Sequence, residues 1–562
     1  MADLKELYFQ NPAFKKVYDL MTTGPRYISS DVEAEFQALS KVKEEFSKLV
    51  LPKDAWIHFI RIGGTAMGNL ATLLKSQGYQ VTGSDDKLYP PMNFILREEK
   101  IHYVESRDPK NLSKTKWPHL KLEASREHPH VLILGNAVGQ EHPEFFEAVK
   151  LVQEKKSILL SLPEAMNKFF IHGRPSFVVT GTHGKTSTTS LLAYALKSLD
   201  KNTGYLIGGK PKDFETGSDY GTAKGPVVLE GDEYNTAITH RNHSKFLYYD
   251  PHWIIVNALE MDHADIFRNE EDILNQFRLL VRITTQGVVL LDDESSPRPA
   301  MMKVLAHEAS ARGLRVIRFG FNENSDFRIK KNSIACEWKT LLGEKRLGVE
   351  LHLNVKINDQ QRKDYILKSP MIGEHQKLNV VAVIATLYAS GYLSEIQDNQ
   401  KWLCEFSGIR RRMEILAVND KHLLIEDFAH HPTAYEFTLK SAKESFPDRK
   451  LCAFMEFHSA TAASNAFYDD LIKLLPIADA VFLKKVNRQR SSISLTSENL
   501  DVDKLAMELS DRCEVYTAST AVELVELYLQ WLSKNHNPKA LELVMSNGAF
   551  EDIYSLLKAK LF

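Results

Sequence analysis

The sequence has 562 residues, of which 43% are hydrophobic and 26% charged, and its formal net charge is −2. This length exceeds what one hydrophobic core holds, and the near-zero charge excludes a nucleic-acid binder that relies on a broadly basic surface. We expect a cytoplasmic protein without membrane insertion, because no apolar run approaches the length of a bilayer span and the N-terminus is unlike a signal peptide. Four scattered cysteines argue against a zinc or disulfide framework and fit a reducing compartment: Cys336, Cys404, Cys452 and Cys513.

The order of predicted elements divides the chain into an extension and three α/β segments. Residues 1–50 are charged, with apolar residues at helical spacing, and predict a helical N-terminal extension on the surface. Residues 51–170 alternate short apolar strands such as WIHFIRI and VLILGNA with helices, which is typical of a parallel sheet. Residues 171–403 repeat this alternation and include alternating segments near 325–366 that suggest antiparallel strands. Residues 404–562 form a third such segment.

A phosphate-binding loop is predicted at FVVTGTHGKTSTTSLLAYAL, where an apolar strand meets a glycine turn and then a helix. Gly181 and Gly184 allow backbone N–H groups to approach an oxyanion, and the helix adds its positive N-terminal end. Lys185 can reach β- and γ-phosphate oxygens, and Thr186 can place a hydroxyl on Mg²⁺. The usual first glycine of this motif is replaced by Val179.

Acidic residues follow two later strands. Glu230 ends the strand PVVL, where open α/β sheets bind ligands, so it is a candidate Mg²⁺ ligand; a solvated turn is the alternative. In NALEMDHAD, His263 stands between Asp262 and Asp265. Mg²⁺ prefers oxygen ligands, so a structural role for His263 is an equal alternative on chemistry alone.

The first βα turn, IRIGGTAMGNLA, allows a function of a different class. With Asp85 after the next strand, it loosely matches the turn of a nicotinamide-dependent dehydrogenase. Such an enzyme does not need the second phosphate loop at Gly184. A non-catalytic binding module is a third possibility, against which the intact Lys185, Thr186, Glu230 and His263 argue.

Six motifs occur in the order found in Mur ligases: TGTHGKTS, EGDEYNTA, NALEMDHAD, GEHQKLN, GIRRRME and DFAHHPT. The chain resembles this family over about residues 55–560, and the family's own loop, T-G-T-x-G-K-T, lacks the first glycine as well. The resemblance implies a three-domain α/β architecture: a Rossmann-like UDP-sugar domain (51–170), a central P-loop ATPase domain (171–403) and a Rossmann-like C-terminal domain that receives the amine (404–562). It also implies ATP and Mg²⁺ as cofactors and an acyl-phosphate intermediate. We expect a monomer or weak homo-oligomer.

Finer strings, among them YPPM and MSNG, resemble one branch of the family. That branch joins the recycled tripeptide L-alanyl-γ-D-glutamyl-meso-diaminopimelate to UDP-N-acetylmuramate during peptidoglycan recycling. A branch that adds L-alanine to the same sugar nucleotide is the alternative.

The resemblance also implies residue roles. Lys185, Glu230 and His263 would be catalytic, and Thr186, Glu230 and His263 would hold Mg²⁺. ATP contacts would come from Gly181, Thr182, His183, Gly184, Lys185, Thr186, Ser187, Gln376, Asn379, Arg412, Asp427 and His430. The two other substrates would contact Gly64, Thr65, Met67, Gly68, Ser84, Asp85, Asn136, His458, Ser459, Ser546 and Asn547. Departures from the family pattern are Arg61 for glycine, Gln376 for asparagine, His458 for arginine and Ala460 for an amide. Without the family, the basic run at Arg412 also fits a solvated turn.

Overall fold

The computed structural model describes residues 9–22, 30–88, 92–199, 202–208, 211–239, 243–260, 267–292, 294–330, 334–458, 462–486 and 499–562. The chain forms two compact units. Unit 1 contains Met1–Lys210, Phe214–Arg328 and Val381–Glu395, and unit 2 contains Pro211–Asp213, Ile329–Val380 and Ile396–Phe562. No helix in the described ranges has the combination of length and apolar character that a bilayer crossing requires.

The first sheet of unit 1 is parallel throughout, with the Rossmann-like strand order β3-β2-β1-β4-β5. Its central strands β1 and β4 are buried along their whole length, which explains why their sequences WIHFI and VLIL are apolar except for His58. The strands are β1 (Trp56–Ile60), β2 (Gln80–Asp85), β3 (His102–Glu105), β4 (Val131–Leu134) and β5 (Ile158–Ser161). The helices are α4 (Thr65–Ser76), α5 (Met92–Glu98), α6 (Pro143–Gln153) and α7 (Leu162–Met166).

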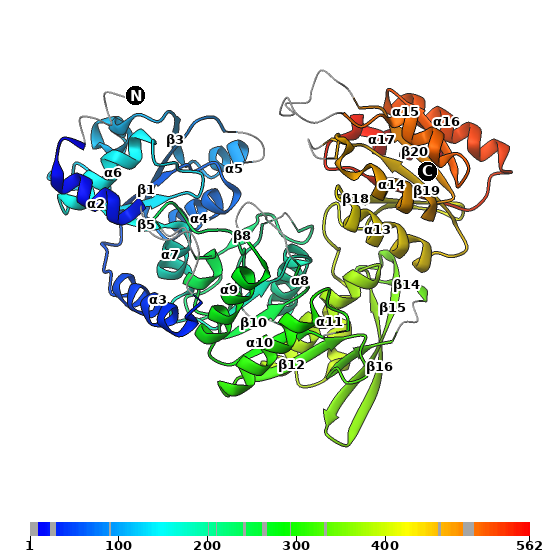
Figure 1. Ribbon diagram of the computed structural model, residues 1–562, viewed down its shortest axis with the longest axis horizontal. Coiled ribbons are helices and arrows are strands. Elements are labelled where there is room, and N and C mark those ends of the chain that lie inside the picture. The colour runs from blue at the N-terminus through cyan, green and yellow to red at the C-terminus, as the bar shows by residue number, and fades with distance from the viewer. Residues whose placement is uncertain are drawn as a thin grey trace. The chain divides into compact units, whose positions relative to one another are not determined.

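Two helices precede this sheet, α2 (Pro12–Thr22) and α3 (Val32–Ser47), and both pack on unit 1 (Figure 1). Helix α2 lies against α6 and buries Phe14 and Tyr18 in the same apolar cluster as Phe145 and Phe146. Helix α3 lies against α9 (Glu270–Ile283), and its Lys43 ammonium is 2.5 Å from an Asp250 carboxylate oxygen. The predicted helices therefore exist, and each buries one face on a different part of the unit.

The second sheet of unit 1 has the order β13-β12-β11-β10-β6-β9-β7-β8 and is parallel except for the β7–β8 pair. Its strands are β6 (Ser176–Thr180), β7 (Gly204–Leu206), β8 (Ser218–Asp219), β9 (Val227–Glu230), β10 (Trp253–Val256), β11 (Gly287–Leu291), β12 (Arg315–Gly320) and β13 (Phe327–Ile329). Helices α8 (Lys185–Ser198), α9 and α10 (Pro299–Ala311) connect them. Strand β6 therefore has β9 and β10 as neighbours, so the loops after these three strands lie together.

Unit 2 contains the antiparallel strands β14 (Ala335–Lys339), β15 (Lys345–Asn358) and β16 (Gln361–Ser369), which confirms the prediction for this region. Helix α12 (Asn399–Leu403) also belongs to unit 2, whereas helix α11 (Glu374–Ala389) has residues 374–380 in unit 2 and residues 381–389 in unit 1. A further sheet has the order β17-β18-β22-β19-β20-β21 and only its edge strand β17 is antiparallel. Alternate residues of β18 enter two different apolar clusters, Leu423 and Ile425 on one face and Leu424 on the other.

The strands of this last sheet are β17 (Glu414–Val418), β18 (His422–Asp427), β19 (Lys450–Met455), β20 (Ala480–Lys484), β21 (Glu514–Ala518) and β22 (Ala540–Met545). Its helices are α13 (Pro432–Ser445), α14 (Tyr468–Leu474), α15 (Val502–Leu509), α16 (Ala521–Lys534) and α17 (Ile553–Leu561). Short helical turns elsewhere are η1 (Pro109–Leu112), η2 (Lys114–Lys116), η3 (Asn167–Ile171), η4 (Lys245–Tyr248), η5 (Ile396–Asp398), η6 (Asn465–Phe467), η7 (Leu475–Ile477) and η8 (Phe550–Asp552).

Candidate active site

The loop between β6 and α8 has the backbone of a phosphate cradle. Gly181 and Gly184 both have left-handed φ angles, +115° and +77°, and Gly184 caps the N-terminus of α8. A Cβ atom on Gly181 would lie 2.8 Å from the carbonyl oxygen of Ala258, so only glycine fits there. The N–H groups of the first turn of α8 are therefore available to an anion at the helix N-terminus.

The Lys185 side chain is almost fully buried at this helix end. Its ammonium donates to the Gly181 carbonyl at 2.8 Å and to both oxygens of Glu233 at 3.1 and 3.0 Å. Ser244 fixes Glu233 in turn, because its hydroxyl donates to the Glu233 carbonyl at 2.7 Å. Glu233 was not singled out by sequence reasoning, although it belongs to the acidic cluster that also contains Glu230.

Thr186 and Glu230 meet beside Lys185. The Thr186 hydroxyl donates to Glu230 Oε1 at 2.8 Å, and the Gly208 N–H donates to Glu230 Oε2 at 2.8 Å. Burial raises the pKa of Glu230, and the charge of Asp232 adds to this effect. A hydroxyl and a carboxylate at a phosphate loop are the oxygen ligands that Mg²⁺ prefers, so these two residues fit a magnesium site.

The other predicted residues of this loop differ in their contacts. His183 is exposed, with Nε2 at 3.3 Å from Glu260 Oε2, while Thr182 is half-buried and Ser187 is buried. His263, the third predicted metal ligand, lies outside the described residues. Within the described ranges, no three His, Cys, Asp or Glu side chains gather in a metal-binding group.

The turn after β1 has a backbone N–H group that is already hydrogen-bonded within the protein, unlike the open N–H groups of a glycine-rich phosphate cradle. The N–H of Gly63 donates to Asp85 Oδ2 at 2.7 Å, so an acidic side chain already occupies this donor. Arg61 has a φ of +70° where the family pattern has glycine, and its Nη1 is 3.0 Å from Asp85 Oδ1. Asp85 therefore bonds both the turn and the Arg61 side chain.

The remaining predicted residues near this turn fall into an exposed and a buried set. Gly64 and Thr65, at the start of α4, and Asn136, after β4, are exposed and available to a ligand. Met67 and Gly68 are buried inside unit 1. A Cβ on Gly68 would lie 2.0 Å from the sulfur of Met92 in α5, so this glycine permits close packing of α4 and α5.

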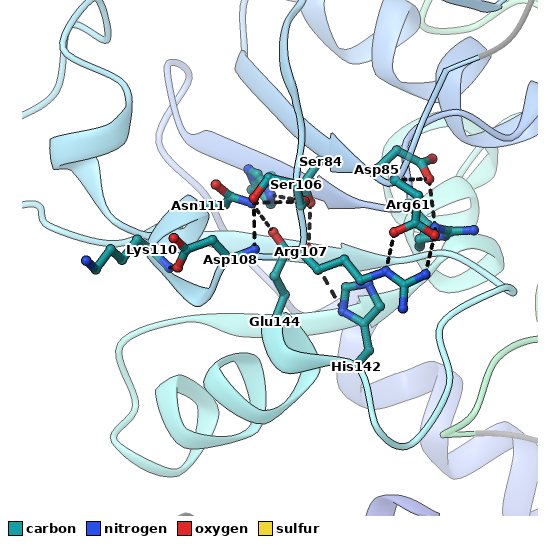
Figure 2. Close-up of polar contacts among 12 residues, drawn as sticks. Arg61, Ser84, Asp85, Ser106, Arg107, Asp108, Lys110, Asn111, His142 and Glu144 are labelled. Atoms are coloured by element: carbon teal, nitrogen blue, oxygen red, sulfur yellow. Dashed lines mark hydrogen bonds and ion pairs between the residues drawn. The ribbon is translucent and has the colours of Figure 1, made fainter. Parts of the chain in front are cut away.

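Ser84 belongs to a buried chain of hydrogen bonds that sequence reasoning missed. Trp56 Nε1–H donates to Thr82 Oγ1 at 2.8 Å, which leaves the Thr82 proton for His58 Nδ1 at 2.7 Å. Burial lowers the pKa of His58 to about 3, so its ring is neutral and Nε2–H donates to Ser84 Oγ at 3.3 Å. Ser84 then donates to Glu144 Oε2 at 2.7 Å (Figure 2).

This chain ends at a buried carboxyl group. Asn111 Nδ2 donates to the second oxygen, Glu144 Oε1, at 2.7 Å. Burial raises the pKa of Glu144 to about 7, against the opposing effect of these hydrogen bonds. His142 lies 4.0 Å away, and burial together with the charges of Arg107 and Arg61 lowers its pKa to about 4. Glu144 is therefore half-ionised near neutral pH beside a neutral imidazole.

In unit 2, Asp427 organises the loop after β18. Its buried carboxylate accepts the N–H groups of Met413 and Ala429, both at 2.8 Å, and burial raises its pKa. The predicted neighbours Arg412 and His430 are exposed. The Asp427 carboxylate thus bonds backbone groups, while Arg412 and His430 are the side chains of this loop that can meet a ligand.

The remaining predicted nucleotide contacts of unit 2 lie in the first turns of α11. Gln376 and Asn379 are both buried, and Asn379 Nδ2 donates to Gln376 Oε1 at 3.1 Å. The longer glutamine side chain, which departs from the family pattern, thus engages the asparagine one helical turn later.

The predicted amine-side residues follow β19 and β22. Ser546 is buried, and its hydroxyl donates to Glu456 Oε2 at 2.7 Å. The Lys484 ammonium is 3.0 Å from Glu456 Oε1. Asn547 has a buried Oδ1 without a hydrogen-bond partner among the described residues, and His458 is exposed. Ser459 lies outside the described residues.

Comparisons with protein families match most of the chain. The Mur ligase family catalytic domain matches residues 56–170, the Mur ligase middle domain matches 179–387, and the Mur ligase glutamate ligase domain matches 411–548. A relative from Escherichia coli K12, named UDP-N-acetylmuramate–L-alanyl-γ-D-glutamyl-meso-2,6-diaminoheptandioate ligase, is 30% identical over 89% of this chain and 97% of its own length. A UDP-N-acetylmuramate–L-alanine ligase from Pediococcus pentosaceus is 31% identical over 78% of this chain and 86% of its own length.

Solved structures give the same result. A murein peptide ligase from Psychrobacter arcticus has a TM-score of 0.53 and 25% identity, covering 90% of this chain and 98% of its own. A UDP-N-acetylmuramate–alanine ligase from Thermotoga maritima has a TM-score of 0.61 at 22% identity, covering 90% and 100%, and supports the fold. These matches confirm the fold class predicted from the motifs, and they give no support to a dehydrogenase. The chain belongs to the Mur ligase family.

Proposed function

We propose that this protein is an ATP-dependent ligase that joins the amine of L-alanyl-γ-D-glutamyl-meso-diaminopimelate to the lactyl carboxylate of UDP-N-acetylmuramate. The carboxylate takes the γ-phosphoryl group of ATP and becomes an acyl phosphate, with release of ADP. The peptide amine then attacks the acyl carbon and loses a proton, and phosphate leaves. The reaction would serve peptidoglycan recycling in the cytoplasm, where ATP and the sugar nucleotide are available.

The observation that carries this proposal is the match to the Escherichia coli ligase named for that tripeptide, which covers 97% of that relative. The phosphate loop supports the ATP-dependent step. Lys185 is the buried cation at the N-terminus of α8, where phosphates bind. Its ammonium would exchange the Glu233 carboxylate for phosphate oxygens and neutralise charge on the transferred group.

Thr186 and Glu230 would hold the magnesium ion, because their oxygens lie 2.8 Å apart at the phosphate loop. When bound, Mg²⁺ supplies positive charge that draws two anions, carboxylate and phosphate, together. His263 remains a proposed ligand from the family motif. In unit 2, the exposed Arg412 and His430 would contact the nucleotide, and Asp427 would hold their loop in shape.

The alternative amine is L-alanine, because the Pediococcus pentosaceus relative is 31% identical. His458 and Ala460 differ from the family pattern and lie in the predicted peptide pocket. These two differences concern the preference for the third residue of the peptide. The greater coverage of the tripeptide ligase, 97% against 86% of the relative's length, favours the tripeptide.

The test is a ligation assay with UDP-N-acetylmuramate, ATP and Mg²⁺ against L-alanine, the dipeptide, the tripeptide and a tetrapeptide. We expect the highest kcat/KM for the tripeptide, together with ADP formation that requires both sugar nucleotide and amine. A preference for free L-alanine would support the alternative. Rapid ADP release with neither substrate present would refute both ligase assignments.

A further inference from the structure

Residues 243–249, which include η4, pair with the acidic loop that follows β9. Asn235 and Ser244 form an antiparallel bridge between the two segments. Beside it, Thr236 donates twice to the carbonyl oxygen of His243, through its N–H at 3.0 Å and through its hydroxyl at 2.8 Å. The 243–249 segment therefore fixes the backbone of the acidic loop.

The loop held in this way carries the carboxylate that bonds Lys185. Glu233 accepts both hydrogen bonds from the Lys185 ammonium through its side chain, and its own carbonyl oxygen accepts the Ser244 hydroxyl at 2.7 Å. A shift of the 243–249 segment would therefore move Glu233, and with it the ammonium at the phosphate loop.

Helix α3 contacts the 243–249 segment through two polar side chains. At the first residue of the segment, His243 Nε2 is 3.3 Å from Glu35 Oε2. At the last residue, the carbonyl oxygen of Tyr249 accepts a hydrogen bond from the Lys43 ammonium at 2.7 Å. One helix of the N-terminal extension thus holds both ends of the segment.

These polar side chains lie on the buried face of α3. Glu35, Leu39 and Lys43 follow one another at intervals of four residues, so they share one face of the helix. Leu39 is buried, and the side chains of Glu35 and Lys43 are only 15% and 12% exposed. Removing charged groups from water costs free energy, and apolar side chains would suffice to bury this face. Two charged groups bonded to one segment indicate that the helix fixes the position of that segment.

We propose that α3 positions the Lys185 ammonium for ATP, through the 243–249 segment and Glu233. Its two inward polar side chains are positioning residues, because they act through other groups. The family match of the first domain begins at residue 56, so α3 lies outside it. A misplacement of about 1 Å caused far from the chemistry lowers a rate by up to about 100-fold. The action of Lys185 on ATP rests on the proposed function, whereas the contacts of α3 are features of this chain.

The test is calorimetric titration of the full chain with ATP and Mg²⁺, and separately with UDP-N-acetylmuramate. We expect Glu35→Ala to weaken ATP binding at least about fivefold, because the charged hydrogen bond from Lys185 to phosphate is weakened. Affinity for the sugar nucleotide should stay unchanged, and in the ligation assay only KM for ATP should rise. Lys43→Ala should show the same selectivity. Glu35→Gln keeps an oxygen that accepts the His243 N–H and should restore ATP affinity to within about twofold of wild type.

Glu33→Ala is the matched control on the same helix. Glu33 pairs instead with Arg282 of α9, at 2.5 Å, so this change weakens the docking of α3 through a different segment. It should leave ATP affinity within about twofold of wild type. Equal losses of affinity for ATP and for the sugar nucleotide in Glu35→Ala would mean general damage to unit 1 and would overturn the inference.

Hydrogen–deuterium exchange at the Thr236 amide reports on the segment itself. Its bond to His243 should open more often in Glu35→Ala than in wild type or in Glu33→Ala. Faster exchange without a change in ATP affinity would overturn the inference, and so would identical behaviour of Glu35→Ala and Glu33→Ala. If wild type binds ATP but ligates no amine, the proposed function fails, and the ATP affinities of the variants still decide the role of α3.

Discussion

The buried carboxyl of Glu144 makes the stability of the first domain depend on pH. Its pKa is about 7 in the folded protein against the usual 4.5, and burial is the main cause. A raised folded pKa means that the folded state binds the proton more tightly than the unfolded state does. The resulting stabilisation is complete below pH 4.5 and is lost as the pH rises through 7.

The size of this effect follows from the two pKa values. Between pH 5 and pH 8 the loss is about 2.5 kcal/mol, because each unit of pKa difference corresponds to about 1.4 kcal/mol. His142 and His58 have pKa values lowered to about 4 and about 3, so they act in the opposite sense. Their contribution to the free energy of unfolding decreases as the pH falls below 6.5. The pH dependence of wild-type stability combines the contributions of all three groups. The contribution of Glu144 is therefore measured as the difference in stability between wild type and a Glu144 variant at the same pH.

Glu144→Gln isolates the contribution of Glu144. The amide fills similar volume, stays neutral and accepts one of the hydrogen bonds from Ser84 and Asn111. We expect the opening free energy of β1 and β4, measured by hydrogen–deuterium exchange corrected for intrinsic rates, to lose about 2.5 kcal/mol less in this variant between pH 5 and pH 8. The exposed Glu141, changed to Gln, is the matched control and should follow wild type. Parallel profiles for wild type and Glu144→Gln would refute the reasoning.

Three further variants test other parts of unit 1. Lys185→Ala should lower kcat by about three orders of magnitude, because it removes charge compensation at the phosphoryl group; near-normal turnover would remove the phosphate-site assignment. Glu230→Gln should raise the Mg²⁺ concentration needed for half-maximal activity by about tenfold, measured by titration at saturating ATP, and an unchanged requirement would exclude Glu230 as a ligand. Leu39→Ala should cost about 2–4 kcal/mol in urea unfolding, because Leu39 is buried where α3 packs on the unit; the exposed Met507, changed to Ala, should cost little.

The predicted elements with the strongest local patterns agree with the structure. Short runs that are mostly apolar predicted β1 and β4, because strands buried on both faces need no polar alternation; His58 is the one polar residue in these two strands. The short strands β3, β5 and β21 were not singled out, since HYVE, ILLS and EVYTA carry exposed or half-buried positions and weak patterns. Their place in a sheet comes from pairing with neighbours such as β2 and β20.

Side-chain contacts are harder to predict than elements. The substrate contact of Ser84 stays a prediction, and the structure adds that its hydroxyl bonds Glu144, which is 60 residues away in sequence. The nucleotide contact of Asp427 also stays a prediction, and its carboxylate bonds two backbone N–H groups. Glu233 is identified as part of the phosphate site only by its hydrogen bond with Lys185. Each of these pairs is formed by chain segments that the fold brings together.

The sequence by itself determined the family, the alternation of strands and helices and the phosphate loop, because these depend on short runs whose chemistry is local. Only the tertiary structure decided that Glu144 is buried and bonded to Ser84 and Asn111, and that Arg61 and Arg107 share Asp86. The physical reason is that burial and charge pairing depend on distances between residues far apart in the chain. Those distances are set when parallel strands align their carboxyl ends along one edge of a sheet.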